Sequence, residues 1–143
     1  MQIAEILRRK GSFVAMVTPV EPVSHVIREL TRLGIGAVVV SSDGTTIEGI
    51  ASERDIVRAL DEFGAASLDL PVRDLMSTRI ETCSADDTVD SLVVTMTNHR
   101  IRHVPVIDGN TIVGIVSIGD VVRTRMDELE RDRDALVDYI EAR

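Results

Sequence analysis

Residues 49–58 read GIASERDIVR, and residues 114–123 read GIVSIGDVVR. The two stretches share a glycine, an isoleucine, a serine, an aspartate and a final Val-Arg pair at the same spacing. Self-similarity of this kind is the signature of an internally duplicated architecture, in which each copy is one supersecondary unit. We therefore expect the chain to contain one unit twice, with a helix opening at Ser52 in the first copy and at Ser117 in the second.

The similarity continues upstream of both stretches. Residues 23–40 align with residues 89–106 without a gap. Each first helix is marked by apolar residues at i, i+3, i+4 and i+7, the spacing of one buried helical stripe. These residues are Val23, Val26, Ile27 and Leu30 in the first copy and Val89, Leu92, Val93 and Met96 in the second. A short apolar segment precedes each helix, at 13–17 and 79–83, and two strands joined by a tight turn follow it.

These elements predict an α/β (α+β) fold in which two β-α-β-β-α repeats pack sheet to sheet with pseudo-two-fold symmetry. Half of a 143-residue chain is marginal as an independent domain, so stacking the halves would bury a shared core. The expected organisation is a first repeat with an N-terminal helix (1–62), a linker (63–71), a second repeat (72–123) and a charged C-terminal helix (124–143). Two equivalent clefts would flank the pseudo-two-fold axis.

Composition restricts the classes of function. Hydrophobic residues make up 44% of the chain but aromatic residues only 2%, so the core must be aliphatic and few side chains could stack on bases. A net charge of −8 disfavours nucleic acids and anionic membranes as partners. Cys83 is the only cysteine, which excludes an intramolecular disulfide and favours a reducing, cytoplasmic setting. Because the chain has only this cysteine and three histidines, a closed metal site within one chain is not expected.

Residues 100–108, RIRHVPVID, together with residues 112–122, IVGIVSIGDVV, resemble the second repeat of a cystathionine-β-synthase (CBS) domain pair. Residues 49–56, GIASERDI, resemble the same motif in the first repeat. The resemblance covers residues 13–123 and identifies the chain as a stand-alone tandem pair, known as a Bateman module. It implies an adenosine-containing ligand, with AMP or ATP expected and ADP, NAD(H) or S-adenosylmethionine as further candidates. No cofactor is expected beside that ligand.

The resemblance also implies which residues hold the ligand. In the Gly-x-x-Ser-x-x-Asp pattern, the glycine would let the ligand approach the backbone, the serine at the helix start would lie near phosphate, and the aspartate would bind ribose. Each cleft would be shared between the repeats, with the backbone at Ile35 and Ile101 reading the adenine edge. One cleft would contain Ser52, Asp55, Thr82, Ser84, Ile101, Arg102 and His103, and the other would contain Ser117, Asp120, Thr18, Ile35, Gly36 and Ala37.

Some of these assignments have a simpler structural interpretation. Ser-x-x-Asp is also the pattern of a capping box, in which the serine caps a helix and the acid reaches back, and both roles can coexist. Arg102 and His103 could be solvated residues at the end of a strand. However, the first copy has no cationic residues at the equivalent positions, and this difference suggests that one cleft holds phosphate better than the other. Arg54 occupies the slot of Gly119, and its bulk could partly fill the first cleft.

The sequence predicts a regulatory module and not an enzyme, since no nucleophile-elbow or phosphate-loop motif is present. The leading hypothesis is a sensor that binds an adenosine nucleotide between the repeats and modulates an unknown effector protein. The alternative is a structural dimerisation module with empty clefts. A homodimer is expected, and the segment 124–143, with apolar residues among many charges, is a candidate surface helix or dimer contact.

Overall fold

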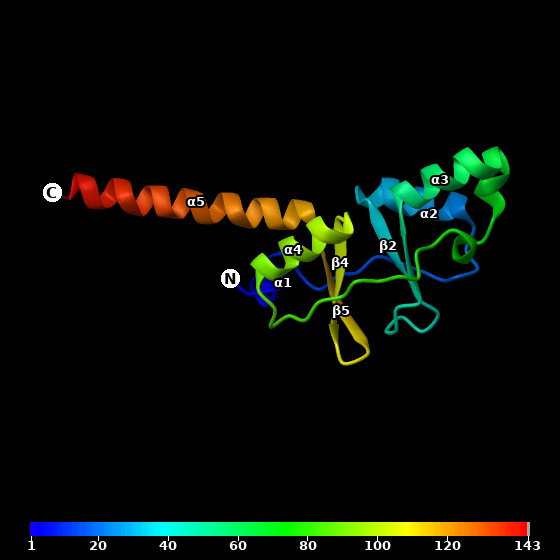
Figure 1. Ribbon diagram of the computed structural model, residues 1–143, viewed down its shortest axis with the longest axis horizontal. Helices are drawn as coiled ribbons and strands as arrows, with labels where there is room; N and C mark the ends of the chain where they lie inside the picture. The colour runs from blue at the N-terminus through cyan, green and yellow to red at the C-terminus, as the bar shows by residue number, and fades with distance from the viewer. Residues whose placement is uncertain (143) are drawn as a thin grey trace.

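The computed structural model describes residues 1–142, which form two lobes and a long helix that extends from one of them (Figure 1). One lobe contains α2, β2 and α3, and the other contains α1, α4, β4 and β5. The order β-α-β-β-α occurs in both lobes, although the first strand of the second lobe is reduced to one bridge. The predicted mixed α/β architecture of two repeats is therefore confirmed.

The first repeat is built on a three-stranded sheet. Its elements are β1 (Met16–Val17), α2 (Val23–Leu33), β2 (Ala37–Val40), β3 (Gly49–Ser52) and α3 (Glu53–Phe63). β2 is central, running parallel to β1 and antiparallel to β3. α2 buries Val23, Val26 and Leu30, as the apolar spacing predicts, and ends at Gly34 in the left-handed conformation. A 3₁₀ helix, Gly64–Asp69, then begins the connection to the second repeat.

The second repeat is built on a two-stranded hairpin. Its elements are α4 (Val89–His99), β4 (His103–Asp108), β5 (Thr111–Ser117) and α5 (Ile118–Glu141). The strand expected at 79–83 is present only as a bridge between Cys83 and Val106, and the one expected at 13–17 spans only Met16–Val17. Both segments are shorter than predicted because the chain crosses between the lobes there. Hydrogen bonding to the neighbouring strand begins at Ala15 in the first segment and at Cys83 in the second.

The two repeats exchange their opening segments. α1 (Ile3–Lys10) opens the first repeat in sequence, yet the backbone N–H of Ile3 donates to the carbonyl of Asp87 in the second, at 2.9 Å. The 3₁₀ helix Val72–Asp74 opens the second repeat, yet the N–H of Val72 donates to the carbonyl of Glu21 in the first, at 2.8 Å. Neither repeat therefore completes its own structure without residues from the other.

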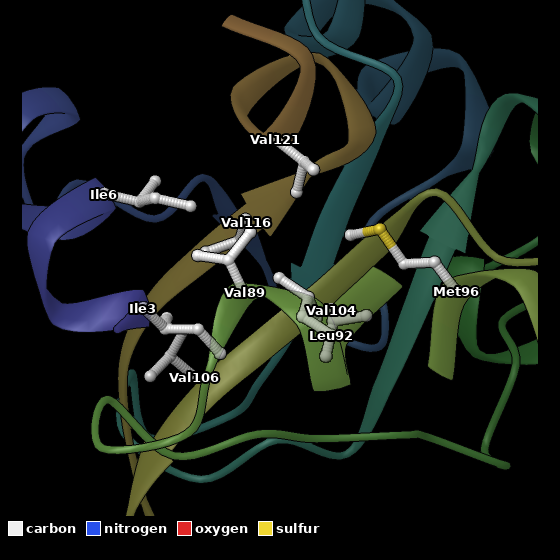
Figure 2. Packing of buried hydrophobic residues seen from close by; sticks show 9 residues of the cluster. All are labelled: Ile3, Ile6, Val89, Leu92, Met96, Val104, Val106, Val116 and Val121. Atoms are coloured by element: carbon white, nitrogen blue, oxygen red, sulfur yellow. The ribbon is translucent and has the colours of Figure 1, made fainter. Parts of the chain in front are cut away.

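The exchanged segments belong to the hydrophobic core. Ile3 and Ile6 of α1 pack with Val89, Leu92, Val106 and Val116 of the second repeat (Figure 2). Val72 takes the corresponding place among the core residues of the first repeat. Ile3 and Val72 are both fully buried, so each is a core residue of the opposite repeat.

α5 is one continuous helix, and it joins the second helix of repeat 2 to the charged tail expected as a separate element at 124–143. Its first turns bury Val121 and Thr124, whereas the part from residue 129 onward is exposed. Figure 1 shows this part leaving the lobe without covering any sheet. Among residues 1–142, no helix has the length and apolar character needed to cross a membrane.

Candidate functional site

A cleft of about 720 Å³ lies where the two repeats meet. One wall is the β3–α3 junction, which contributes Ser52, Arg54 and Asp55, and the opposite wall is the α4–β4 connection, residues 99–103. Ser77 lines the cleft from the segment that follows the 3₁₀ helix Val72–Asp74. This space, the first cleft, is therefore built from both repeats.

A second cleft of about 430 Å³ lies at the β5–α5 junction, opposite the α2–β2 connection. It contains Ser117 and Asp120, the counterparts of the serine and aspartate in the first cleft. Gly36 and His103 line both clefts, so the two spaces adjoin. A Cβ on residue 36 would lie only 3.1 Å from Cε1 of His103, so this glycine gives the imidazole room between the clefts.

Both Ser-x-x-Asp sequences form capping boxes, and both aspartates also line a cleft. In α3, the N–H of Ser52 donates to Oδ2 of Asp55 at 2.9 Å, and the N–H of Asp55 donates back to Oγ of Ser52 at 3.4 Å. In α5, the same bonds join Ser117 and Asp120 at 2.8 and 3.2 Å. The capping box holds each carboxylate through Oδ2 and leaves Oδ1 outside the box.

The first cleft carries a local excess of positive charge in an acidic chain. Its arginines are Arg54, Arg58, Arg79, Arg100 and Arg102. Within residues 1–142, none of them forms an ion pair with a carboxylate, although Glu53, Asp55 and Glu81 line the same cleft. Guanidinium groups without carboxylate partners around a hollow favour an anionic ligand with several acceptor oxygens.

Arg100 is held at the first cleft in an uncommon backbone conformation. It ends α4 at φ 53° and ψ 44°, in the left-handed region, whereas the equivalent residue at the end of α2 is Gly34. This conformation costs an L-residue about 1–2 kcal/mol. The carbonyl of Arg100 accepts a 3.2 Å hydrogen bond from Nη1 of Arg54, so the two walls of the cleft are joined there. The left-handed residue ends the helix, as Gly34 does in the first repeat, and an arginine kept in this conformation at a cleft motivates the hypothesis of a functional role.

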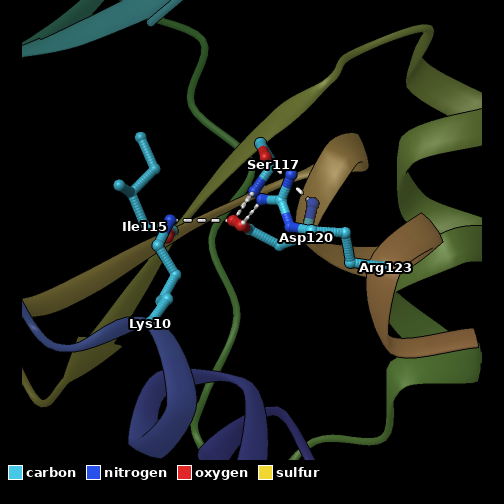
Figure 3. Close-up of polar contacts among 5 residues, drawn as sticks. All are labelled: Lys10, Ile115, Ser117, Asp120 and Arg123. Atoms are coloured by element: carbon cyan, nitrogen blue, oxygen red, sulfur yellow. Dashed lines mark hydrogen bonds and ion pairs between the residues drawn. The ribbon is translucent and has the colours of Figure 1, made fainter. Parts of the chain in front are cut away.

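In the second cleft, two positively charged side chains already contact the carboxylate of Asp120 (Figure 3). Nζ of Lys10 lies 2.7 Å from Oδ2 of Asp120 and 2.8 Å from the carbonyl oxygen of Ile115, while Nη2 of Arg123 lies 2.6 Å from Oδ1. Burial raises the pKa of Asp120, but hydrogen bonds from Lys10, Ser117 and Arg123 outweigh burial and hold the pKa below its ordinary value. Asp120 is therefore an ionised carboxylate with both oxygens engaged.

His103 is the titratable group between the clefts. Burial lowers its pKa, the charge of Arg102 lowers the pKa further, and Glu53 acts in the opposite direction. The imidazole is consequently neutral at pH 7 in the unliganded protein. An anion in either cleft would favour its protonated form.

A family model for the CBS domain matches the chain twice, at residues 3–62 and 72–127. The chain belongs to the CBS domain family. The two matches correspond to the two repeats, and they confirm the tandem pair that the sequence motifs predict.

Several CBS proteins resemble this CBS pair over most of its length. A mitochondrial CBS domain-containing protein of Arabidopsis thaliana is 31% identical over 97% of this chain and 71% of its own. The crystal structure of a CBS-domain containing protein from Agrobacterium tumefaciens superposes with a TM-score of 0.85 at 39% identity, covering 87% of this chain and 99% of that one. A CBS domain protein from Pyrobaculum aerophilum, solved in complex with AMP, superposes with a TM-score of 0.74 at 27% identity, covering 84% of this chain and 89% of that one.

The clefts of the CBS pair collect most of the site residues expected from the sequence. The first contains Ser52, Asp55, Ile101, Arg102 and His103, and the second contains Ile35, Gly36, Ala37, Ser117 and Asp120. Of these residues, Ile35, Gly36, Ala37, His103 and Ser117 line both clefts. Contrary to expectation, the structure does not bring Thr82, Ser84 or Thr18 to either cleft. Thr18 and Ser84 begin turns, where their N–H groups donate to the carboxylates of Glu21 and Asp87. Thr82 is exposed within the segment 79–83, which is present only as the bridge at Cys83.

The role predicted for the glycine of the repeated motif is wrong. We expected it to let the ligand approach, but Gly49 and Gly114 line neither cleft. A Cβ on Gly49 would lie 2.4 Å from Sδ of Met76, and one on Gly114 would lie 2.6 Å from Cδ2 of Leu7. Each glycine therefore makes room for a side chain of the exchanged segment, which the local pattern cannot reveal.

Sequence reasoning also missed several cleft residues. Lys10 and Ser77 reach the two clefts only because the opening segments are exchanged, and no local motif marks them. In the sequence, Arg58 and Arg79 look like ordinary surface arginines, but the fold places both at the first cleft. Arg100 carried a signal, because the aligned residue of the first copy is Gly34 and a helix-ending glycine implies the left-handed conformation.

Proposed function

We propose that this CBS pair is a sensor that binds an adenosine phosphate in the first cleft and thereby regulates a partner protein. One observation carries the proposal. A buried carboxylate with a weakly occupied oxygen lies in the same cleft as five arginines that have no carboxylate partner in the described part of the chain. The CBS protein of Pyrobaculum aerophilum, solved in complex with AMP, supports this class of ligand.

Asp55 is suited to bind the ribose. Its Oδ2 accepts from the N–H and the hydroxyl of Ser52 at 2.9 and 3.0 Å, whereas Oδ1 receives only the hydroxyl of Ser77, at 3.4 Å. A bond of this length is weak, so a ribose hydroxyl can replace it at little cost. The ribose diol would therefore donate to Oδ1.

Apolar side chains of the first cleft would contact the adenine. Ile50, Ile80 and Ile101 line it from both repeats. The N–H of Ile101 already donates to the carbonyl of Met96 at 3.0 Å, so it cannot read the base. The carbonyl oxygen of Ile101 would instead accept a hydrogen bond from the adenine amino group.

The charge of the first cleft favours ATP and ADP over AMP. A single phosphate carries about −1.5 to −2 charges at pH 7, which leaves most of the arginines without an anionic partner. A triphosphate supplies more charge and more acceptor oxygens, which guanidinium groups bind in pairs. S-adenosylmethionine carries a sulfonium cation, so the same arginines oppose it. The expected order of affinity is ATP, ADP, AMP and then S-adenosylmethionine.

Calorimetric titration of the full chain with these four ligands tests the proposal. Asp55→Asn should weaken ATP binding by about tenfold, or ~1.4 kcal/mol, because an amide is a poorer acceptor for the ribose. Asp120→Asn is the matched control for the affinity of the first site, which should stay unchanged because that aspartate caps the equivalent helix but lies in the second cleft. Background heat with all four ligands would favour the alternative, a structural module with empty clefts.

The proposal assigns binding to the cleft and no reaction. Burial, aided by the charge of Asp87, raises the pKa of the Cys83 thiol to about 12, so this thiol is not a nucleophile at neutral pH. In residues 1–142, no group of three acidic, histidine or cysteine side chains is suited to hold a metal ion. ATP incubated with the chain should be recovered unchanged by chromatography, and a hydrolysis product would overturn this part of the proposal.

A homodimer formed through α5 is the second part of the proposal. Val122, Met126, Leu129, Leu136 and Ile140 are exposed and lie at alternating coiled-coil positions, with Arg133 at the one position that is not apolar. The helix from residue 129 onward has no lobe beneath it, and a helix of that length is marginal in water by itself. A second α5 would cover this seam.

Charge favours an antiparallel pair. In a parallel pair Arg133 would face its own copy, whereas an antiparallel pair centred on residue 131 would place it opposite Leu129 and beside Glu130 and Asp132 of the second copy. Light scattering should therefore give a dimer for the full chain and a monomer for the double variant Leu129→Glu, Leu136→Glu. Ala135→Glu, on the same helix but off the seam, should remain a dimer. A monomeric wild type at high micromolar concentration would overturn the proposal.

A further inference from the structure

Different residues from the exchanged segments contact the two aspartates. In the first cleft, Ser77 follows the exchanged 3₁₀ helix and pairs with Ile50 through two backbone hydrogen bonds of 2.8 and 3.0 Å. Its hydroxyl then reaches Asp55 at 3.4 Å. In the second cleft, Lys10 ends the exchanged helix α1, and its ammonium group makes the equivalent pair of contacts, to the carbonyl of Ile115 and to Asp120.

Because Lys10 stands where the first cleft has Ser77, the second cleft differs in the ligands that its aspartate can bind. A hydroxyl 3.4 Å from Asp55 leaves that carboxylate able to take hydrogen bonds from a neutral diol. An ammonium group 2.7 Å from Asp120, with a second anchor on Ile115, forms a charge-assisted bond about twice as strong as a neutral one. A ribose hydroxyl cannot displace Lys10 on equal terms.

The rest of the second cleft remains suited to a nucleotide. Phe13 lines it and is 69% exposed, and an exposed aromatic side chain can stack on a base. Arg123 also lines it and has a largely exposed side chain, so its guanidinium can turn from Asp120 toward a phosphate. Ser117 stands at the N-terminus of a long helix, as Ser52 does in the first cleft.

We propose that Lys10 is a built-in occupant of the second cleft, which is a latent adenosine-phosphate site, and that the difference between Lys10 and Ser77 limits the chain to one bound nucleotide. The inference rests on the proposed function of the first cleft for its choice of ligand. Its geometric basis is independent, because it concerns the residues that hold Asp120.

Replacing Lys10 should not disturb the fold. The residues that anchor α1 are Ile3 and Ile6, which are buried, whereas Lys10 lies at the exposed end of the helix and is followed by Gly11. Lys10→Ala therefore removes the ammonium group without touching the core. Lys10→Arg is the matched control, since a guanidinium group keeps the positive charge beside Asp120.

Calorimetric titration of the full chain with ATP tests the inference through the number of sites. The wild type and Lys10→Arg should bind one ATP per chain, and Lys10→Ala should bind two. Adding Phe13→Ala to Lys10→Ala should weaken the new site and leave the first one unchanged. The reciprocal variant Ser77→Lys should weaken the first site by at least about tenfold, because it places an ammonium group beside Asp55.

The outcomes separate this inference from the proposed function. Two sites in the wild type, or one site in both the wild type and a folded Lys10→Ala, would overturn the role of Lys10 and leave the first cleft as proposed. No site in the wild type but one in Lys10→Ala would overturn the first cleft and support the latent site. No binding by either protein would overturn both.

Discussion

Met76 packs so closely on Gly49 that a Cβ on the glycine would lie 2.4 Å from Sδ of the methionine. Leu7 packs on Gly114 in the same way, with its Cδ2 atom 2.6 Å from the position of a Cβ. Both glycines begin the repeated motif, and both side chains come from the opening segment of the other repeat. In each repeat, the motif glycine is therefore a site where the opening segment of the other repeat packs.

Gly114→Ala should destabilise the chain by about 1–3 kcal/mol, because the added methyl group overpacks the contact with Leu7. Leu7→Ala in the same chain makes room for the methyl group, so the double variant should lose less than the sum of the two single changes. Urea unfolding followed by circular dichroism measures these differences. Gly119→Ala is the control, since a Cβ there meets nothing closer than 3.5 Å. Unfolding of Gly114→Ala at the wild-type midpoint would contradict the role of the glycine.

Arg100→Gly should separate stability from binding. Glycine adopts the left-handed conformation at φ 53° without penalty, so the variant should be unchanged in stability or more stable by up to about 1 kcal/mol. The same change removes one guanidinium group from the first cleft, so ATP should bind several-fold more weakly. Thermal unfolding and calorimetry measure the two effects. Arg100→Ala should lose affinity without gaining stability, and unaltered ATP affinity in both variants would exclude Arg100 from the site.

Local rules predicted the parts of this molecule that depend on local sequence. The apolar spacing located the buried face of α2, and Ser-x-x-Asp located the start of α3 and of α5, because helix periodicity and capping act within a few residues. The exchange of opening segments was not predictable in this way. It depends on contacts between residues distant in sequence, such as Ile3 with Asp87 and Val72 with Glu21, and it decides the roles of Lys10 and Ser77.

The ion pair between Lys10 and Asp120 should make the chain sensitive to acid. The pKa of Asp120 is lowered in the folded state, so its contribution to stability is present above the unfolded-state pKa of about 4 and is lost as the pH falls through the folded-state value. Lys10→Ala removes one cause of the lowered pKa and should show a smaller fall in melting temperature between pH 6 and pH 3. Lys10→Arg should behave as the wild type. Equal acid sensitivity in all three proteins would mean that other carboxylates dominate.

Binding of ATP near pH 6 should be accompanied by uptake of a proton at His103. Burial, Arg102 and Lys10 lower the pKa of this imidazole in the free protein, against the opposing charges of Glu53 and Asp120, so near pH 6 it carries less bound proton than an imidazole with the ordinary pKa of about 6.5. A polyphosphate in the adjoining cleft adds negative charge and raises that pKa, so ATP should bind more tightly as the pH falls from 7 to 6.

Calorimetry in buffers of different ionisation enthalpy counts the protons taken up. His103→Gln should abolish the uptake and the pH dependence, whereas His25→Gln, on the exposed side of α2 outside both clefts, should retain them. Proton uptake that persists in His103→Gln would assign the titration to the phosphate or to another residue.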